Sequence, residues 1–142
     1  MNYEKWEELH YKKHQSILAK LNKFDDISII EYFDYENMRI KESDFCPLYR
    51  DGIKCHDIKK LNCYLCGCPY FRYIKDGYKR DNKTIFSYCS INSKYAKEFE
   101  SNREIHLDCS DCNIPHLKGF IKKYFDRDWS SIMSKVIQTT PK

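Results

Sequence analysis

The chain has 142 residues and a mass of 17.2 kDa, a length typical of one domain with a modest hydrophobic core. Hydrophobic residues make up 42% and charged residues 32% of the sequence, which excludes an intrinsically disordered chain. It lacks the run of ~20 apolar residues that a membrane span requires, and its start lacks the apolar core of a signal peptide. We therefore expect a cytoplasmic protein that has no membrane partner.

Residues 1–43 form the first predicted part of the chain, an N-terminal helical segment. Apolar side chains recur at near-helical intervals over residues 2–24 and predict an amphipathic helix that ends near Asp25. Ser28 followed by Glu31 fits a capping box, which predicts a second, shorter helix. A strand over 27–35 is a competing interpretation, because Ile, Tyr and Phe also favour strands.

Glu7, His10 and His14 fall about one turn apart on the first predicted helix. Helical di-iron proteins use a Glu-x2-His motif, but they use it twice and add two further glutamates. This sequence has one copy. We therefore interpret these three residues as part of a solvated helix face.

Residues 44–142 form the second predicted part, a cysteine-rich metal-binding domain with C-terminal helices. Aromatic runs at 70–74 and 84–88 predict short strands on either side of a turn, which the Asp76-Gly77 and Asp81-Asn82 steps indicate. Asn113 predicts the cap of one later helix, and Asp128 that of another that buries Trp129 and continues to Ile137. The predicted fold is a small, metal-stapled α+β domain: two N-terminal helices, an irregular cysteine-rich centre with short strands, and two C-terminal helices.

All eight cysteines lie between Cys46 and Cys112. Cytosolic thiols stay reduced, so such a cluster indicates metal binding, whereas disulfides become the alternative if the chain is secreted. Two CxxC pairs strengthen the metal interpretation, because the tight turn in each pair directs both sulfurs at one ion. The candidate metal ligands are Cys46, Cys55, His56, Cys63, Cys66, Cys68, Cys89, Cys109, Cys112 and His116.

Structural zinc takes four ligands in a tetrahedron, so two closed sites would use eight of these ten residues. One arrangement places the two CxxC pairs, 63/66 and 109/112, at one ion. The second ion would then take its ligands from Cys46, Cys55 or His56, Cys68, Cys89 and His116. Other divisions, including a shared two-metal cluster, fit the spacing equally well. An iron–sulfur cluster is the alternative cofactor, because cysteine thiolates hold it too.

The stretch FCPLYRDGIKCHDIKKLNCYLCGCPYF, followed by Cys89 and DCSDCNIPH, resembles the bacterial and archaeal cysteine-rich small domain family. The resemblance covers residues 44–125, and its most specific parts are NCYLCGCP at 62–69 and the CSDC pair with Pro115-His116. It implies a zinc-finger-like metal-binding domain in which the eight cysteines and two histidines are metal-site candidates. Some relatives are fused to cobalamin-biosynthesis enzymes, which implies a second alternative, an enzyme accessory in cofactor metabolism.

The formal net charge of +4 counts every thiol as neutral. Eight thiolates would lower this charge by eight and two zinc ions would raise it by four, so the metal-loaded protein would be near neutral. Cations alternate with aromatics over 70–83, as on single-strand nucleic-acid platforms, but a hairpin with core-facing aromatics gives the same pattern. Nucleic acid is therefore a weakly supported partner.

The sequence also lacks the common phosphate-binding and hydrolase motifs, so we do not expect an enzyme. The function that the sequence favours is metal binding at two Cys/His sites, with structural zinc in an interaction or accessory role toward an unknown protein partner. An iron–sulfur protein in electron transfer or redox sensing is the first alternative. The oligomeric state is left open.

Overall fold

The computed structural model describes residues 2–139, which divide into two compact units. Unit 1 consists of the described residues up to Cys66 together with Asn113–Ile132. Unit 2 consists of Gly67–Cys112 together with the described residues from Met133 onward. The expected division after residue 43 partitions the chain differently and stays a prediction. Among the described helices, none is both long and apolar enough to cross a membrane.

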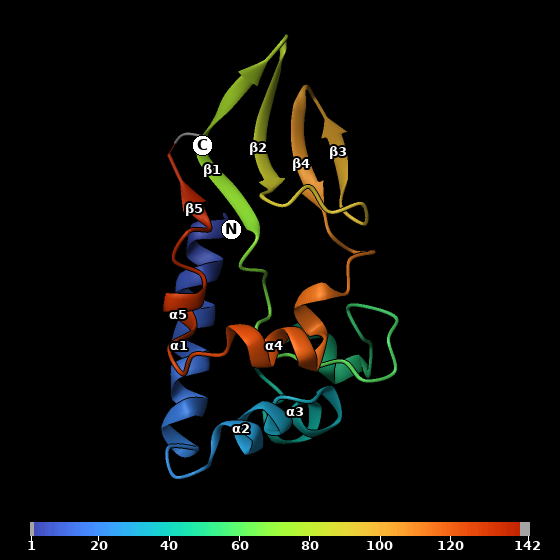
Figure 1. The fold of residues 1–142 in the computed structure, drawn as a ribbon. Helices are drawn as coiled ribbons and strands as arrows, with labels where there is room; N and C mark the ends of the chain where they lie inside the picture. Colours follow the sequence, from blue (N-terminus) through green and yellow to red (C-terminus); the bar gives the residue numbers. More distant parts are fainter. Residues whose placement is uncertain (1, 140–142) are drawn as a thin grey trace. The chain divides into compact units, whose positions relative to one another are not determined.

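Unit 1 is helical (Figure 1). Its helices are α1 (Tyr3–Lys20), α2 (Asp26–Tyr32), α3 (Tyr35–Lys41), α4 (Lys118–Tyr124) and α5 (Trp129–Ile132), with 3-10 helices η1 (Pro47–Asp51) and η2 (Ile114–His116). Asn2 begins α1 and Asp25 begins α2, because their side-chain oxygens accept hydrogen bonds from backbone amides three residues later, at 2.9 Å and 2.8 Å. The predicted second helix is two helices, since the chain turns at Phe33–Asp34 between α2 and α3.

The core of unit 1 is aromatic. Trp129 and Tyr64 are fully buried, and each polar group finds a backbone acceptor. Trp129 Nε1 donates to the carbonyl of Leu65 at 2.7 Å, and the Tyr64 hydroxyl donates to the carbonyl of Asp126 at 2.6 Å. These bonds fix the CxxC segment that contains Leu65 to the chain around α5.

The solvated-face interpretation of α1 is wrong, because His10 and His14 are only 4% and 0% exposed. Their rings lie 4.9 Å and 6.2 Å from the Trp129 ring, centroid to centroid. His14 Nε2 donates to the Tyr64 carbonyl at 3.0 Å, which lets a neutral imidazole lie in the aromatic core. An imidazole on a helix face is as well suited to aromatic packing as to water.

Acid is expected to destabilise unit 1 through these two histidines. Burial lowers the pKa of His10 to about 3 and that of His14 to about 4, from an ordinary value of 6.5. Below pH 6.5 the unfolded chain therefore binds protons that the native chain does not. The free energy of unfolding should fall by up to ~1.4 kcal/mol per pH unit for each histidine as the pH drops toward those values.

Urea unfolding at pH 7 and pH 5 measures this loss. His10→Phe keeps the aromatic packing and should reduce the difference between the two pH values. Ile17→Val, at another buried position of α1, should lower stability equally at both. The assignment fails if His10→Phe leaves the pH dependence unchanged.

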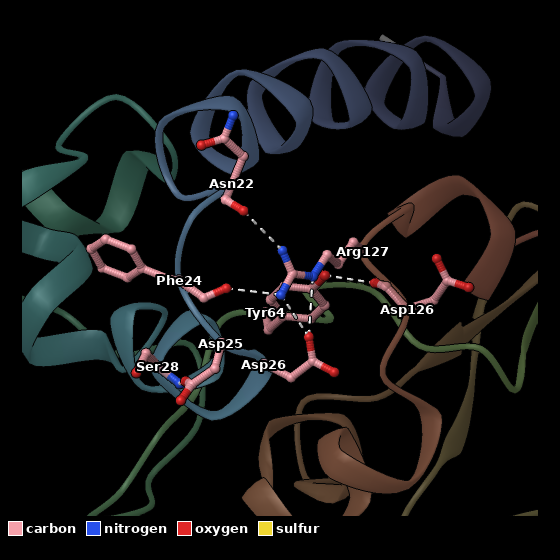
Figure 2. A network of polar contacts seen from close by, with 8 residues as sticks. All are labelled: Asn22, Phe24, Asp25, Asp26, Ser28, Tyr64, Asp126 and Arg127. Atoms are coloured by element: carbon pink, nitrogen blue, oxygen red, sulfur yellow. Dashed lines mark hydrogen bonds and ion pairs between the residues drawn. The ribbon is translucent and has the colours of Figure 1, made fainter.

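Arg127 connects the segment before α5 to the chain between α1 and α2 (Figure 2). Its guanidinium donates to the carbonyls of Asn22 and Phe24, at 3.4 Å and 2.8 Å, and to Asp26 Oδ1 at 2.8 Å. Carbonyls beyond the last turn of a helix lack partners within it and attract cations. The sequence contains no local signal for these bonds, because the partners lie 101 to 105 positions apart.

Arg127→Ala should lower the free energy of unfolding by about 1–3 kcal/mol, because three acceptors lose a charged donor. Arg127→Lys keeps the positive charge but lacks the planar guanidinium. Its free energy of unfolding should lie between those of Arg127→Ala and the natural protein. Arg50→Ala is the matched control, since Arg50 and its partner Asp44 are 77% and 87% exposed. In thermal unfolding, the loss of stability should be largest for Arg127→Ala, smaller for Arg127→Lys and smallest for Arg50→Ala. Equal losses for Arg127→Ala and Arg50→Ala would contradict the stabilising role of Arg127.

Unit 2 contains a five-stranded mixed sheet with the strand order β3-β4-β2-β1-β5 (Figure 1). The strands are β1 (Phe71–Arg80), β2 (Lys83–Cys89), β3 (Lys97–Ser101), β4 (Glu104–Asp108) and β5 (Ile137–Gln138). The β1–β2 and β3–β4 pairs are antiparallel, whereas the β2–β4 and β1–β5 pairs are parallel. Ile74, Ile85 and Ile105 form a small buried cluster on the sheet.

This sheet shows that the predicted layout, with an irregular centre and short strands, is wrong. The first hairpin extends to ten residues in β1, and its turn lies at residues 81–82. The Asp76-Gly77 step is no turn, because the register shifts between Tyr73 and Tyr78 and leaves Gly77 at φ +70° in a bulge. The second hairpin was not predicted, since its turn uses Asn102 and Arg103 at positive φ without any glycine.

The predicted second C-terminal helix is also wrong in extent. α5 ends at Ile132, and Ile137 pairs with Tyr73 in the parallel strand β5. The amide of Tyr73 donates to the carbonyl of Val136 at 2.8 Å. The chain here satisfies its backbone through the sheet, where β-branched residues such as Val and Ile pack well.

Candidate metal centre

None of the eight cysteines, all of which lie in the described part of the chain, forms a disulfide, and they divide equally between the two units. Unit 1 contains six of the predicted ligands: Cys46, Cys55, His56, Cys63, Cys66 and His116. Unit 2 contains the other four: Cys68, Cys89, Cys109 and Cys112. The 63/66 pair belongs to unit 1 and the 109/112 pair to unit 2, and the arrangement that placed both pairs at one ion stays a prediction.

Three of the unit 1 ligands are already assembled. The ligand atoms of Cys55, His56 and His116 all lie within 4.8 Å of one another, and no other such trio occurs among residues 2–139. Cys55 Sγ is 3.1 Å from His56 Nδ1 and 3.8 Å from His116 Nε2. Around a tetrahedral zinc ion, sulfur and nitrogen ligands stand about 3.5 Å apart, so these separations fit a shared ion.

His116 is held in the orientation that a ligand needs. Its Nδ1 donates to the carbonyl of Asn62 at 2.9 Å, which leaves the lone pair of Nε2 directed toward Cys55. Burial lowers the pKa of His116 to about 4, so the imidazole is neutral at neutral pH, as metal binding requires.

Asn62 is the residue that sequence analysis missed at this site. It is fully buried, and its side chain donates to the carbonyl of Ile30 and to Asp34 Oδ1, at 2.7 Å and 2.9 Å. Its own side-chain oxygen accepts from the amide of Tyr64 at 2.8 Å. These bonds fix the start of the NCYLC segment, a role that its place next to Cys63 could have indicated.

The other thiols of unit 1, those of Cys46, Cys63 and Cys66, act electrostatically on Tyr49, which is 3% exposed. Burial, followed by the charges of Cys63, Cys66 and Cys46, raises the pKa of Tyr49 well above its ordinary value. Burial, with the charges of Cys55 and Cys46 added, raises the pKa of Cys63 to about 12. Thiolates in this group would therefore repel one another unless a cation is bound among them.

The topology of the sheet gathers the cysteines of unit 2 at one end. Cys89 ends β2, and Cys109 follows β4, which runs parallel to β2. Parallel strands end at the same edge of a sheet, so these two cysteines emerge together. β1 begins at Phe71, which pairs with Cys89, and the Phe71 amide donates to the carbonyl of Cys68 at 3.0 Å.

Ser93 links two of these cysteines. Its amide donates to Cys89 Sγ at 3.5 Å, and its hydroxyl lies 3.6 Å from Cys112 Sγ. The Cys112 amide donates to the Cys109 carbonyl at 3.0 Å and closes the tight turn of the CxxC pair. Amides and hydroxyls near the sulfurs are the groups that surround thiolate ligands in metal sites.

The electrostatics of the four thiols agree with this grouping. Burial, followed by the charges of Cys68, Cys112 and Cys89, raises the pKa of Cys109 to about 12. Burial also raises the pKa of Cys68, and the charges of Cys89 and Cys112 add to it. No three of these sulfurs lie within 4.8 Å of one another, so an ion here would draw the loops together.

The aromatic and basic segment over 70–83 forms β1 and the turn after it. Tyr78 packs against the isoleucine cluster of the sheet. Arg80 forms a bidentate ion pair with Glu98 at 2.9 Å and 3.0 Å, and Lys83 pairs with Glu100 at 2.8 Å. These contacts favour the hairpin interpretation over a nucleic-acid platform.

No family model, no curated protein and no solved structure matches the chain. The resemblance to the cysteine-rich small domain family is therefore neither supported nor refuted.

Proposed function

We propose that the protein binds metal at two cysteine-rich sites, one in each unit, and that the metal is structural zinc. The observation that carries this proposal is the assembled group of Cys55, His56 and His116 in unit 1. The division of the candidate ligands supports it, since unit 1 holds six and unit 2 holds four. Four ligands are the complement of a structural zinc site. The proposal places the protein in a reducing compartment such as the cytoplasm, where thiols remain available.

Zinc is favoured over an iron–sulfur cluster by the two histidines. Imidazole nitrogen is an ordinary zinc ligand, whereas most clusters are held by cysteine alone. The four cysteines of unit 2 match the ligand count of either cofactor, so this unit provides the stronger case for the iron–sulfur alternative.

A structural role for the ion agrees with the packing of unit 2. Its buried sheet cluster contains three isoleucines, to which Tyr78 and Tyr88 add partly buried surface. So small a core needs a further constraint, and a metal ion at the cysteine end would supply one. We propose an interaction or accessory role for the protein, for which the fully exposed edge strand β3 offers unpaired backbone groups.

Elemental analysis and a visible spectrum of protein purified without oxygen test this proposal. About two or more zinc ions per chain and no band near ~400 nm are expected for zinc thiolate sites. Iron with acid-labile sulfide and a broad brown absorption would show that the cofactor is an iron–sulfur cluster and not zinc. Protein that is folded and free of metal would refute both versions.

A further inference from the structure

Unit 1 contains more ligands than one closed zinc site uses. Six donors lie in this unit, and the ligand atoms of three of them, Cys55, His56 and His116, lie within 4.8 Å of one another. Within the described chain no fourth Cys, His, Asp or Glu ligand atom joins this trio at the same distance. The trio therefore has the three-protein-ligand composition typical of zinc sites that keep one coordination position for an exogenous ligand.

The exposure of the three side chains shows from where such a ligand would enter. Cys55 is exposed and His56 is half-buried, whereas His116 is buried and tied to Asn62. One side of the trio is thus anchored in the protein, and the other is open to solvent. Closed structural sites are instead completed by a fourth protein ligand.

We propose that Cys55, His56 and His116 hold a divalent zinc-class ion whose fourth position is occupied by a small exogenous Lewis base, such as water, hydroxide or a small anion. This inference rests on the proposed function, because it takes metal binding in unit 1 as given and assigns that site an open fourth position; the closed structural site is then the one in unit 2. Water bound at such a position is acidified and can act as a nucleophile, which the four-thiolate site of unit 2 would not allow.

Cobalt(II) provides a visible probe of the open position, because its spectrum reports ligand type and coordination number. The full chain is loaded with Co²⁺ without oxygen and titrated with azide. We expect azide to change the cobalt spectrum, and His56→Ala to weaken the azide response at least tenfold and to reduce bound cobalt by about one ion per chain. His106→Ala, at a half-buried position of β4 in unit 2, is the matched control and should leave the response intact.

The outcomes separate this inference from the proposed function. A chain that binds cobalt but does not respond to azide has only closed sites, which overturns the inference and leaves metal binding standing. A response that survives both His56→Ala and Cys55→Ser also overturns it, because the open ion then lies elsewhere. A folded chain that binds neither Co²⁺ nor Zn²⁺ refutes the proposed function itself. His56 is half-buried and Cys55 is exposed, so circular dichroism should show that His56→Ala and Cys55→Ser retain the fold.

Discussion

Cys109→Ser is expected to remove about one zinc ion per chain and to unfold the cysteine end of the sheet in unit 2. Structural zinc contributes ~10–16 kcal/mol in small domains, as much as the whole stability of many domains. The sheet has only a small isoleucine cluster to compensate for that loss. Cys109 also starts the turn after β4, so its release frees the loop that leads to Cys112.

Hydrogen exchange of the amides near Cys89 and Cys109, together with zinc analysis, measures this effect. A chelator added to the natural protein should reproduce the exchange pattern of Cys109→Ser, because both remove the same ion. Ser90→Ala is the matched control, because Ser90 is exposed beside Cys89 and the substitution keeps the amide that donates to the Tyr70 carbonyl. Full zinc content and unchanged exchange in Cys109→Ser would exclude Cys109 as a ligand.

Trp129→Ala is expected to lower the free energy of unfolding of unit 1 by about 3–5 kcal/mol. Trp129 is fully buried, and its ring packs on His10 and beside Trp6 and Tyr11. The substitution also removes the donor to the Leu65 carbonyl, one residue before Cys66. We therefore expect weaker metal binding in unit 1 in addition to lower stability.

Trp129→Phe separates these two effects. Phenylalanine retains most of the packing but leaves the buried Leu65 carbonyl without its partner, which costs about 1–3 kcal/mol. Trp6→Phe is the control, because Trp6 is only half-buried and should lose less. Urea unfolding followed by far-ultraviolet circular dichroism ranks the three variants. A loss below ~1 kcal/mol in Trp129→Ala would show that the Trp129 cluster does not support unit 1.

Helix α1 could be predicted from the sequence, because its apolar residues recur with the helical period over a long segment. The structure of residues 129–138 could not be predicted in this way. Trp129, Ile132 and Val136 fit a helical period equally well, and only the pairing of Ile137 with β1 shows that the helix stops. Strands β3 and β4 were missed because β3 is charged and fully exposed.

The kinds of ligand at the candidate site followed from residue type and local spacing, but their grouping did not. His116 lies 61 positions from Cys55 and 54 from Asn62, so only the tertiary structure brings these three together. The same limit applies to unit 2, where Cys89 and Cys109 become neighbours through a parallel strand pair. Parallel pairing connects distant segments and leaves no turn motif that a sequence could reveal.

Unit 1 is built from two segments of the chain that are separated in sequence by Gly67–Cys112, and this affects its folding during synthesis. A ribosome must synthesise all of Gly67–Cys112 before Trp129 and Arg127 exist to complete this unit. Synthesis proceeds at ~5–20 residues per second, whereas hairpins form within ~10 microseconds, so β1–β2 and β3–β4 have time to form first. The part of α1 that Trp129 contacts, with the rings of Trp6 and His10, lacks this cover during that interval. The nascent chain should then be a client of chaperones that recognise apolar helices, and its dependence on them should end once residue 132 has left the ribosome.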